Sequence, residues 1–204
     1  DLSHDWMPVI DRAVTVLRSG GTCAFPTDTL YGLGCNALEP TAVRRVFDIK
    51  RRSAVKALPM FVRDLAWARE LAHITPEQER VIAALWPGKV TFVLPRRPIV
   101  PTNMSGGGQT IGLRAPDHPV VQALLEHLGY PIAGTSANLS GSESISDGAR
   151  VVEEFAAAPM APDIVIDAGA IPQSEPSTVV DFTSAVPRIV RQGAVRADKI
   201  LALL

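Results

Sequence analysis

Residues 110–141 read TIGLRAPDHPVVQALLEHLGYPIAGTSANLSG, and this stretch decides the fold class. Residues 110–114 and 131–135 are short runs rich in strand-forming side chains. Between them, residues 117–128 place apolar side chains at helical spacing, with Asp117 as the expected N-cap. A strand, a helix and a second strand in this order predict an α/β domain.

The same alternation continues on both sides of this stretch. We expect further helices that begin near Pro8 and stop at Gly20, and at 41–49, 64–72, 75–86, 146–155 and 200–201. We expect further strands at 22–26, 57–62, 89–94, 163–166, 177–182 and 188–191, with a glycine-rich loop at 27–34. The last strands are joined by connections too short for helical crossovers. The chain is therefore predicted to form a single domain over residues 1–204, with a twisted mixed parallel and antiparallel sheet flanked by helices.

The composition excludes two classes of protein. The 204 residues carry 20 Lys and Arg against 21 Asp and Glu, so no overall positive charge is available to coat a nucleic acid. No apolar run reaches the roughly 20 residues that a membrane-spanning helix needs. Residues 1–11 lack the basic start and apolar stretch of a secretory signal, and Cys23 and Cys35 form neither a disulfide framework nor a metal-ligand set. We expect a cytoplasmic protein with no membrane association.

Three phosphate-binding or nucleophile templates do not match the sequence. Gly88-Lys89 is followed by Val90 where a Walker motif needs Ser or Thr. The glycines at 106–108 lack the third glycine of a dinucleotide-binding loop. Residues 134–138 begin like a nucleophile elbow, but Asn138 stands where the closing glycine belongs.

The densest charge feature is a run of cations around residue 50. Its members are Arg44, Arg45, Lys50, Arg51, Arg52 and Lys56, with Asp48 as the single acid among them. Such a run is often a solvated helix end, where cations complement the helix dipole. It also lies between an expected helix and an expected strand, where a loop can direct side chains into a concave site. In the second case Lys50 and Arg52 converge on one anion.

Other candidates add anion and hydroxyl partners. Arg114 ends an expected strand, which suits either a carboxylate clamp or a structural cap. Hydroxyl pairs at strand ends serve turns and caps more often than ligands; they are Thr27 with Thr29, Thr135 with Ser136, and Ser177 with Thr178. Asp28 could contact a metal, although a lone carboxylate is a weak signal. His4, His73, His118 and His127 are scattered, so the sequence predicts the positioning of anions rather than nucleophilic or metal chemistry.

Seven motifs in order then identify a resemblance. They are Pro26-Thr27-Asp28-Thr29-Leu30-Tyr31-Gly32-Leu33-Gly34, Lys50-x-Arg52, Trp86-Pro87-Gly88, Gly112-Leu113-Arg114-Ala115-Pro116, Thr135-Ser136-Ala137-Asn138-Leu139-Ser140-Gly141, Ser177-Thr178-Val179-Val180-Asp181 and Arg191-Gln192-Gly193-Ala194. The chain resembles the short-form, YrdC-type threonylcarbamoyl-AMP synthases over about residues 8–196. The resemblance implies a mixed α/β fold with a deep basic cavity, and no second domain after the 200–201 helix.

The resemblance also implies an activity and its partners. Such enzymes join L-threonine, bicarbonate and ATP, accompanied by Mg²⁺, into threonylcarbamoyl-adenylate and pyrophosphate. A downstream complex then transfers the threonylcarbamoyl group to tRNA. The residue types fit this chemistry, because a carbamate and a nucleotide repel each other and need several cations between them. A lid that excludes water is expected at 142–147 or at 95–108.

The resemblance assigns roles position by position. Lys50 and Arg52 match the catalytic pair. The nucleotide-binding matches are Arg52, Lys56, Thr110, Ser136, Asn138, Ser144 and Arg191. The threonine-pocket matches are Thr29, Arg114, Gly134 and Ser177. No residue is assigned to the metal.

Two positions depart from the family pattern, and two other functions stay open. Ser53 stands where many relatives have Pro, and Phe61 stands where some carry His near threonine. One alternative is a non-catalytic protein that binds double-stranded RNA through the 44–56 run. Weak RNA binding is also compatible with the synthase. Another alternative is a carbamoyl-transfer module of the same fold.

Overall fold

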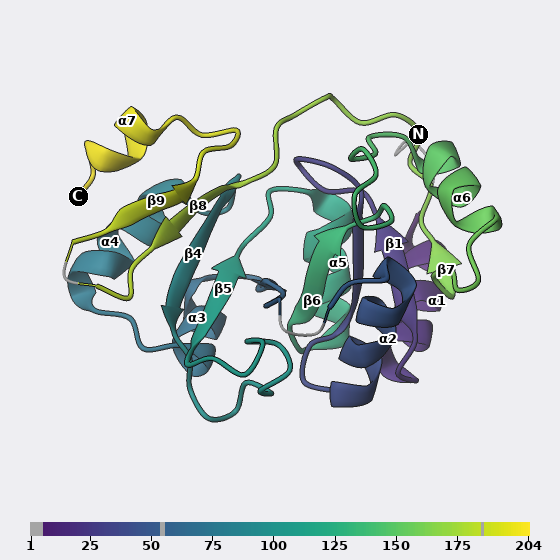
Figure 1. Ribbon diagram of the computed structural model, residues 1–204, viewed down its shortest axis with the longest axis horizontal. Coiled ribbons are helices and arrows are strands. Elements are labelled where there is room, and N and C mark those ends of the chain that lie inside the picture. The colour runs from purple at the N-terminus through teal and green to yellow at the C-terminus, as the bar shows by residue number, and fades with distance from the viewer. Residues whose placement is uncertain (1–5, 54–55, 185) are drawn as a thin grey trace.

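The computed structural model describes residues 6–53, 56–184 and 186–204. Within them, one mixed sheet is flanked by helices on both faces (Figure 1). The first five residues lie outside the described residues. They include His4 and part of the segment from which the sequence predicts a cytoplasmic location.

Apart from β2 (Gly32–Asn36), which the sequence does not predict, the element order matches the predicted alternation. The helices are α1 (Met7–Arg18), α2 (Pro40–Lys50), α3 (Leu65–Leu71), α4 (Pro76–Leu85), α5 (Pro119–Leu128), α6 (Gly148–Ala156) and α7 (Ala197–Leu201). The strands are β1 (Thr22–Phe25), β2 (Gly32–Asn36), β3 (Met60–Phe61), β4 (Val90–Pro95), β5 (Thr110–Arg114), β6 (Ile132–Ser136), β7 (Ile164–Val165), β8 (Thr178–Asp181) and β9 (Arg188–Arg191).

The sheet is mixed, as predicted. Its nine strands run in the order β7-β1-β2-β6-β3-β5-β4-β8-β9. The pairs β7–β1, β3–β5 and β4–β8 are parallel, and the other neighbours are antiparallel. Because β7 and β9 are opposite edges, the chain between β7 and β8 has to cross most of the sheet, and Figure 1 shows it arching over the top of the molecule.

Side-chain alternation explains the two layers of helices. In β1, Cys23 and Phe25 belong to a core cluster with α1 and α5, whereas Ala24 belongs to a cluster with α2 on the other face. In β4, Val90, Phe92 and Leu94 join the same second cluster, together with apolar residues of α3 and α4. The opposite face of β4 is thus free of core helices and available for a site.

Helix ends follow local chemistry, with one correction. The predicted Thr75–Gln78 capping box is confirmed at the start of α4. At α5 the predicted cap Asp117 is wrong: the Nδ1 atom of His118 accepts the Val120 N–H instead. The longest helix, α1, has 12 residues, and no helix in the described ranges is long and apolar enough to cross a membrane.

The loop predicted at 27–34 is partly wrong, because β2 begins inside it at Gly32. The sequence does not predict this strand, because its glycines are typical of turns. Their role is close approach: a Cβ at Gly34 would lie 2.5 Å from the Ala133 carbonyl oxygen of β6. The predicted 57–62 strand is shorter than expected, with ladder pairing at Met60 and Phe61 alone among its residues.

Candidate active site

A cavity of about 450 Å³ lies on the free face of the sheet, and we call it the main cavity. Alternate residues of the strands line it: Thr91 and Val93 from β4, and Thr110, Gly112 and Arg114 from β5. A second hollow of about 290 Å³, the side cavity, shares Arg52 and Ser136 with it. The two hollows therefore adjoin.

All the predicted site residues lie on these two cavities. The main cavity is lined by Thr29, Arg52, Thr110, Arg114, Gly134, Ser136, Ser144, Ser177 and Arg191. The side cavity is lined by Lys50, Arg52, Lys56, Ser136 and Asn138, with Ser140 and Gly141. Residues from distant parts of the chain thus meet in one place, and their individual roles stay predictions.

Lys50 is the buried cation of the side cavity. It is the last residue of α2 and only 3% exposed. Its Nζ donates to the Ser136 carbonyl oxygen at 2.6 Å, the Ser136 hydroxyl at 3.3 Å and the Asn138 Oδ1 at 2.9 Å. The Asn138 side-chain amide donates in turn to the Ser142 carbonyl oxygen at 2.7 Å. Lys50 therefore holds the 136–142 loop against the end of α2.

Arg52 is aimed into both cavities by an unusual backbone turn. Arg51 ends α2 in the left-handed conformation, at φ 49° and ψ 40°, and the chain then reverses direction. The Nη2 atom of Arg52 donates to the Ala57 carbonyl oxygen at 3.0 Å, and its buried Nε has no partner within the described structure. Burial lowers the pKa of this guanidinium. Lys56 is exposed at the rim of the side cavity.

Lys50 loses its proton within a pH range that can be reached by experiment. Its pKa is lowered from 10.5 to about 8, mainly by burial and also by the neighbouring Arg52, while the Glu154 carboxylate acts in the opposite direction. The side cavity is therefore most positive below about pH 8. The free energy of unfolding instead rises with pH in this range. Between about pH 8 and pH 10.5 the folded state binds fewer protons than the unfolded chain, so deprotonation of Lys50 favours the folded state.

We predict that binding of a non-hydrolysable ATP analogue weakens by about tenfold between about pH 7 and pH 9. Only the protonated Lys50 offers its charge to a phosphate, and titration through a pKa of about 8 removes that charge. Calorimetry without threonine keeps the titration of the substrate amine out of the measurement. Lys50→Met is the control and should show little of this dependence; an equal dependence in that variant would contradict the assignment.

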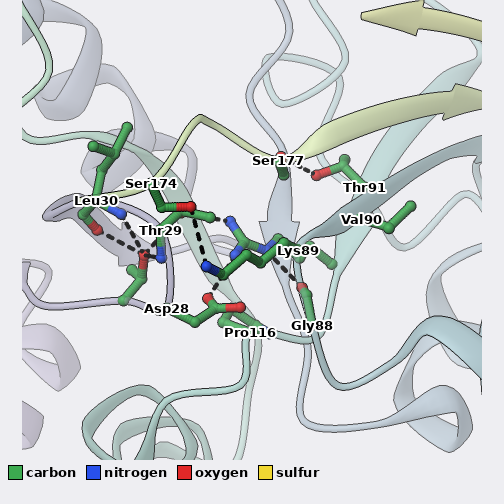
Figure 2. Close-up of polar contacts among 12 residues, drawn as sticks. Asp28, Thr29, Leu30, Gly88, Lys89, Val90, Thr91, Pro116, Ser174 and Ser177 are labelled. Atoms are coloured by element: carbon green, nitrogen blue, oxygen red, sulfur yellow. Dashed lines mark hydrogen bonds and ion pairs between the residues drawn. The ribbon is translucent and has the colours of Figure 1, made fainter. Parts of the chain in front are cut away.

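Arg114 is held rigidly at the other end of the main cavity. Its Nη2 contacts Asp28 Oδ1 at 2.5 Å, its Nη1 donates to the Thr29 hydroxyl at 3.1 Å, and its Nε donates to the Gly88 carbonyl oxygen at 3.0 Å. Figure 2 labels these three partners. The Arg114 and Asp28 side chains are 5% and 7% exposed. Three of the five guanidinium N–H groups are used, which leaves two for a ligand. This geometry suits a carboxylate clamp.

A third cation closes the same end of the main cavity. Arg191 in β9 donates through Nη2 to the Ser177 carbonyl oxygen at 2.7 Å and to its hydroxyl at 3.2 Å. The Ser177 hydroxyl also shares a 2.8 Å hydrogen bond with the Thr91 hydroxyl. Arg191 is exposed overall, and partial desolvation lowers the pKa of its guanidinium. The hydroxyl groups are therefore already oriented by their neighbours.

The wall between the two strands β3 and β6 is apolar and tight. A Cβ at Gly134 would lie 2.5 Å from the ring of Phe61, which packs edge-on against Phe25 with ring centroids 6.3 Å apart. The Arg114 guanidinium carbon lies 5.9 Å from the Phe61 ring centroid. Phe61 therefore forms the wall of the main cavity between Gly134 and Arg114.

We predict that Gly134→Ala lowers the free energy of unfolding by about 1–3 kcal/mol, because the added methyl group overlaps the Phe61 ring. Urea unfolding monitored by circular dichroism measures the loss. The same substitution in a Phe61→Leu background should cost less, since the smaller side chain frees the space. An equal cost in both backgrounds would show that Phe61 is not the obstacle.

Over the described ranges, His, Cys, Asp and Glu form no group of three or more that could hold a metal. Asp28, which the sequence offered as a possible metal contact, is instead the ion-pair partner of Arg114. Its buried Oδ2 has no hydrogen-bond partner among the described atoms.

Sequence reasoning missed three residues around the main cavity. Thr91 lines it, and the period-two pattern of its strand was the signal that could have found it. Tyr31 lies in a quoted motif but received no role; its hydroxyl donates to the Gly169 carbonyl oxygen at 2.7 Å. Lys89, rejected as a Walker lysine, binds Ser174 beside the clamp.

The two loops predicted as lids differ in how firmly they are packed against the rest of the fold. Residues 142–147 border the main cavity through Ser144, which is exposed. In the 95–108 loop, Val100 and Met104 are buried in the core, and the Met104 carbonyl oxygen accepts the Leu58 N–H at 2.9 Å. The second loop is therefore fixed, and the first stays the candidate lid of the two.

Comparisons with known proteins find relatives that match most of this chain. The Sua5/YciO/YrdC family model, described as "Telomere recombination", matches residues 15–193. A threonylcarbamoyl-AMP synthase from Pyrococcus abyssi is 36% identical over 92% of this chain and 55% of the relative. The chain thus spans about half the length of that relative.

Two solved structures extend the comparison. The crystal structure of P. abyssi Sua5 complexed with L-threonine matches with a TM-score of 0.90 and 36% identity, over 96% of this chain and 57% of that one. The structure of Escherichia coli YciO matches with a TM-score of 0.86 and 32% identity, over 95% and 93% of the two chains. The chain belongs to the Sua5/YciO/YrdC family.

Proposed function

We propose that this protein is a threonylcarbamoyl-AMP synthase, which converts L-threonine, bicarbonate and ATP into threonylcarbamoyl-AMP and pyrophosphate. The observation that carries the proposal is the pair of adjoining cavities with cations at both ends. Arg114 and Arg191 lie at one end, and Lys50, Arg52 and Lys56 lie at the other. Such a cleft suits a substrate pair with a carboxylate on one partner and a triphosphate on the other.

The proposed binding mode follows from these positions. The threonine carboxylate takes the two free N–H groups of Arg114, beside the hydroxyls of Thr29 and Ser177 and the small Gly134. The phosphates lie between Lys50, Arg52 and Lys56, with Ser136 and Asn138 as neutral partners. The nucleoside lies toward Thr110, Ser144 and Arg191.

The chemistry needs positioning and charge rather than a protein nucleophile. The threonine amine attacks bicarbonate, releases water and becomes a carbamate. A carbamate oxygen then attacks the α-phosphorus, and the bond from that phosphorus to the bridging oxygen breaks, so pyrophosphate leaves. Two unit charges about 4 Å apart repel by about 4 kcal/mol at an effective dielectric near 20. The clustered cations offset that repulsion and stabilise the leaving group.

Mg²⁺ enters this proposal as part of the nucleotide substrate. Mg²⁺ prefers an octahedral shell of oxygens, often from phosphates and water with few protein ligands. The described residues offer no cluster of three or more ligating side chains, so phosphate oxygens and water would complete most of the shell. No protein ligand is assigned.

The relatives support the same substrates. The P. abyssi relative is named for this synthesis, and a Sua5 structure with comparable fold binds L-threonine. We further propose a cytoplasmic enzyme whose product is consumed by a tRNA threonylcarbamoyl-transfer complex. The double-stranded RNA alternative is not favoured, because Lys50 is buried and Arg45 is engaged with Asp163 at 2.7 Å. The 44–56 run is therefore not one open basic surface.

The test is the reconstituted reaction with each substrate omitted in turn. Pyrophosphate release is expected to require threonine, bicarbonate and Mg-ATP together, and mass spectrometry should detect threonylcarbamoyl-AMP. Isotope from labelled bicarbonate should enter the product. Pyrophosphate release that is independent of threonine would contradict the proposal.

A further inference from the structure

Residues 169–176 form a strap between β7 and β8, and both of its ends are attached at the main cavity. At the first end, the cavity-lining Tyr31 donates to the Gly169 carbonyl oxygen, and Ile171 N–H donates to the Ser146 carbonyl oxygen at 2.8 Å. At the second end, Pro176 lines the cavity and its carbonyl oxygen accepts the Ala194 N–H at 2.9 Å. The strap thus connects two attachment points next to the cavity, and Pro176 is the residue of the strap that lines it.

The middle of the strap has little to hold it. Residues 172, 173 and 175 are exposed, and 174 is half-buried. Among the described residues, one hydrogen bond joins 172–175 to the rest of the fold: Lys89 Nζ donates to the Ser174 hydroxyl at 3.1 Å (Figure 2). The Ser174 hydroxyl donates onward to the Glu175 carbonyl oxygen at 3.0 Å.

Lys89 is well placed to act as the anchor of this bond. It follows Gly88, whose carbonyl oxygen accepts Arg114 Nε. Its own carbonyl oxygen accepts the Thr178 N–H at 3.0 Å. The Lys89 backbone is therefore fixed between the clamp and β8, and its side chain reaches from there to the strap.

We propose that Lys89 is a positioning residue that holds the strap across the Arg114 end of the main cavity through Ser174. A strap held in place keeps Pro176 and Ser177 against the ligand and limits the access of water to a carbamate. Lys89 need not touch the substrate for this. The kinetic consequence rests on the proposed function, whereas the strap's attachment does not.

A spin label tests the attachment directly. Cys23 and Cys35 are completely buried, and they are the two cysteines of the chain, so Gln173→Cys adds one accessible thiol on the exposed strap. In this background the label should become more mobile in Lys89→Met and in Ser174→Ala, by electron paramagnetic resonance. Lys89→Arg retains donors and should restore part of the immobilisation. Lys199→Met, at an exposed position of α7, is the matched control and should change nothing.

Steady-state kinetics supply the second readout. Lys89→Met should raise the KM for threonine by about tenfold, the value of one charge-assisted hydrogen bond, and change the KM for ATP by less than about twofold. Unchanged label mobility in both Lys89→Met and Ser174→Ala would overturn the proposal, as would an equal change in Lys199→Met. Were the wild-type protein to make no threonylcarbamoyl-AMP, the proposed function would fail while the label still decided the role of Lys89.

Discussion

Lys50→Met is expected to lower threonylcarbamoyl-AMP formation by about 100- to 1000-fold without lowering the thermal unfolding temperature. The loss follows from removing a buried cation that would face the transferring phosphates. Stability is expected to hold because methionine occupies a similar volume and no longer requires a charge to be buried. The depressed pKa of Lys50 records that burial cost. Pyrophosphate release and differential scanning calorimetry provide the two measurements.

Lys56→Met is the matched control for that variant. It also removes a cation from the side cavity, but Lys56 is exposed and its charge is screened by water. We expect a loss of activity below about tenfold. Lys50→Met and Lys50→Ala both leave Ser136 and Asn138 without their donor, but Lys50→Ala also empties space, which makes it the poorer probe. A Lys50→Met variant that unfolds early and retains activity would assign Lys50 to structure alone.

The two ends of the site differ in how far sequence could predict them. The strand 110–114 is visible in the sequence, and its period-two pattern alone puts residues 110, 112 and 114 on one face. The resemblance then brought Lys50 and Asn138 into one set. Their actual contact joins residues 88 positions apart, from the last residue of α2 to the loop that follows β6. No local pattern encodes such a contact.

The errors in prediction have similar causes. The Gly32-Leu33-Gly34 segment predicts a loop because glycine usually marks turns, yet in the structure a neighbouring strand leaves no room for a Cβ at Gly34. Asp117 was preferred as a cap on residue preference, but His118 takes the position because its ring accepts the Val120 N–H. Asp28 looked like a lone carboxylate because Arg114 is distant in sequence and adjacent in space.

The ion pair between Asp28 and Arg114 determines how the proposed binding of the threonine carboxylate by Arg114 has to be tested. A single Arg114→Met substitution removes the ligand for the substrate carboxylate, but it also leaves Asp28 buried without its counter-ion. The unpaired carboxylate should destabilise the fold by about 3–5 kcal/mol. Loss of activity in the single variant would then mix two effects. Urea unfolding is expected to show this loss of stability clearly.

The double variant Asp28→Asn with Arg114→Met separates the loss of stability from the loss of threonine binding. The neutral amide needs no counter-ion, so most of the lost stability should return. Threonine use should not return: without the guanidinium, the KM for threonine should stay about 100-fold above that of the wild-type protein, while the KM for ATP changes by less than about threefold. Asp28→Asn alone keeps Arg114 and should retain most of the threonine affinity, since Thr29 and Gly88 still accept from the guanidinium. A double variant that regained both stability and threonine affinity would show that the substrate carboxylate is held elsewhere, and the Arg114 end of the cavity would then have to bind a different group.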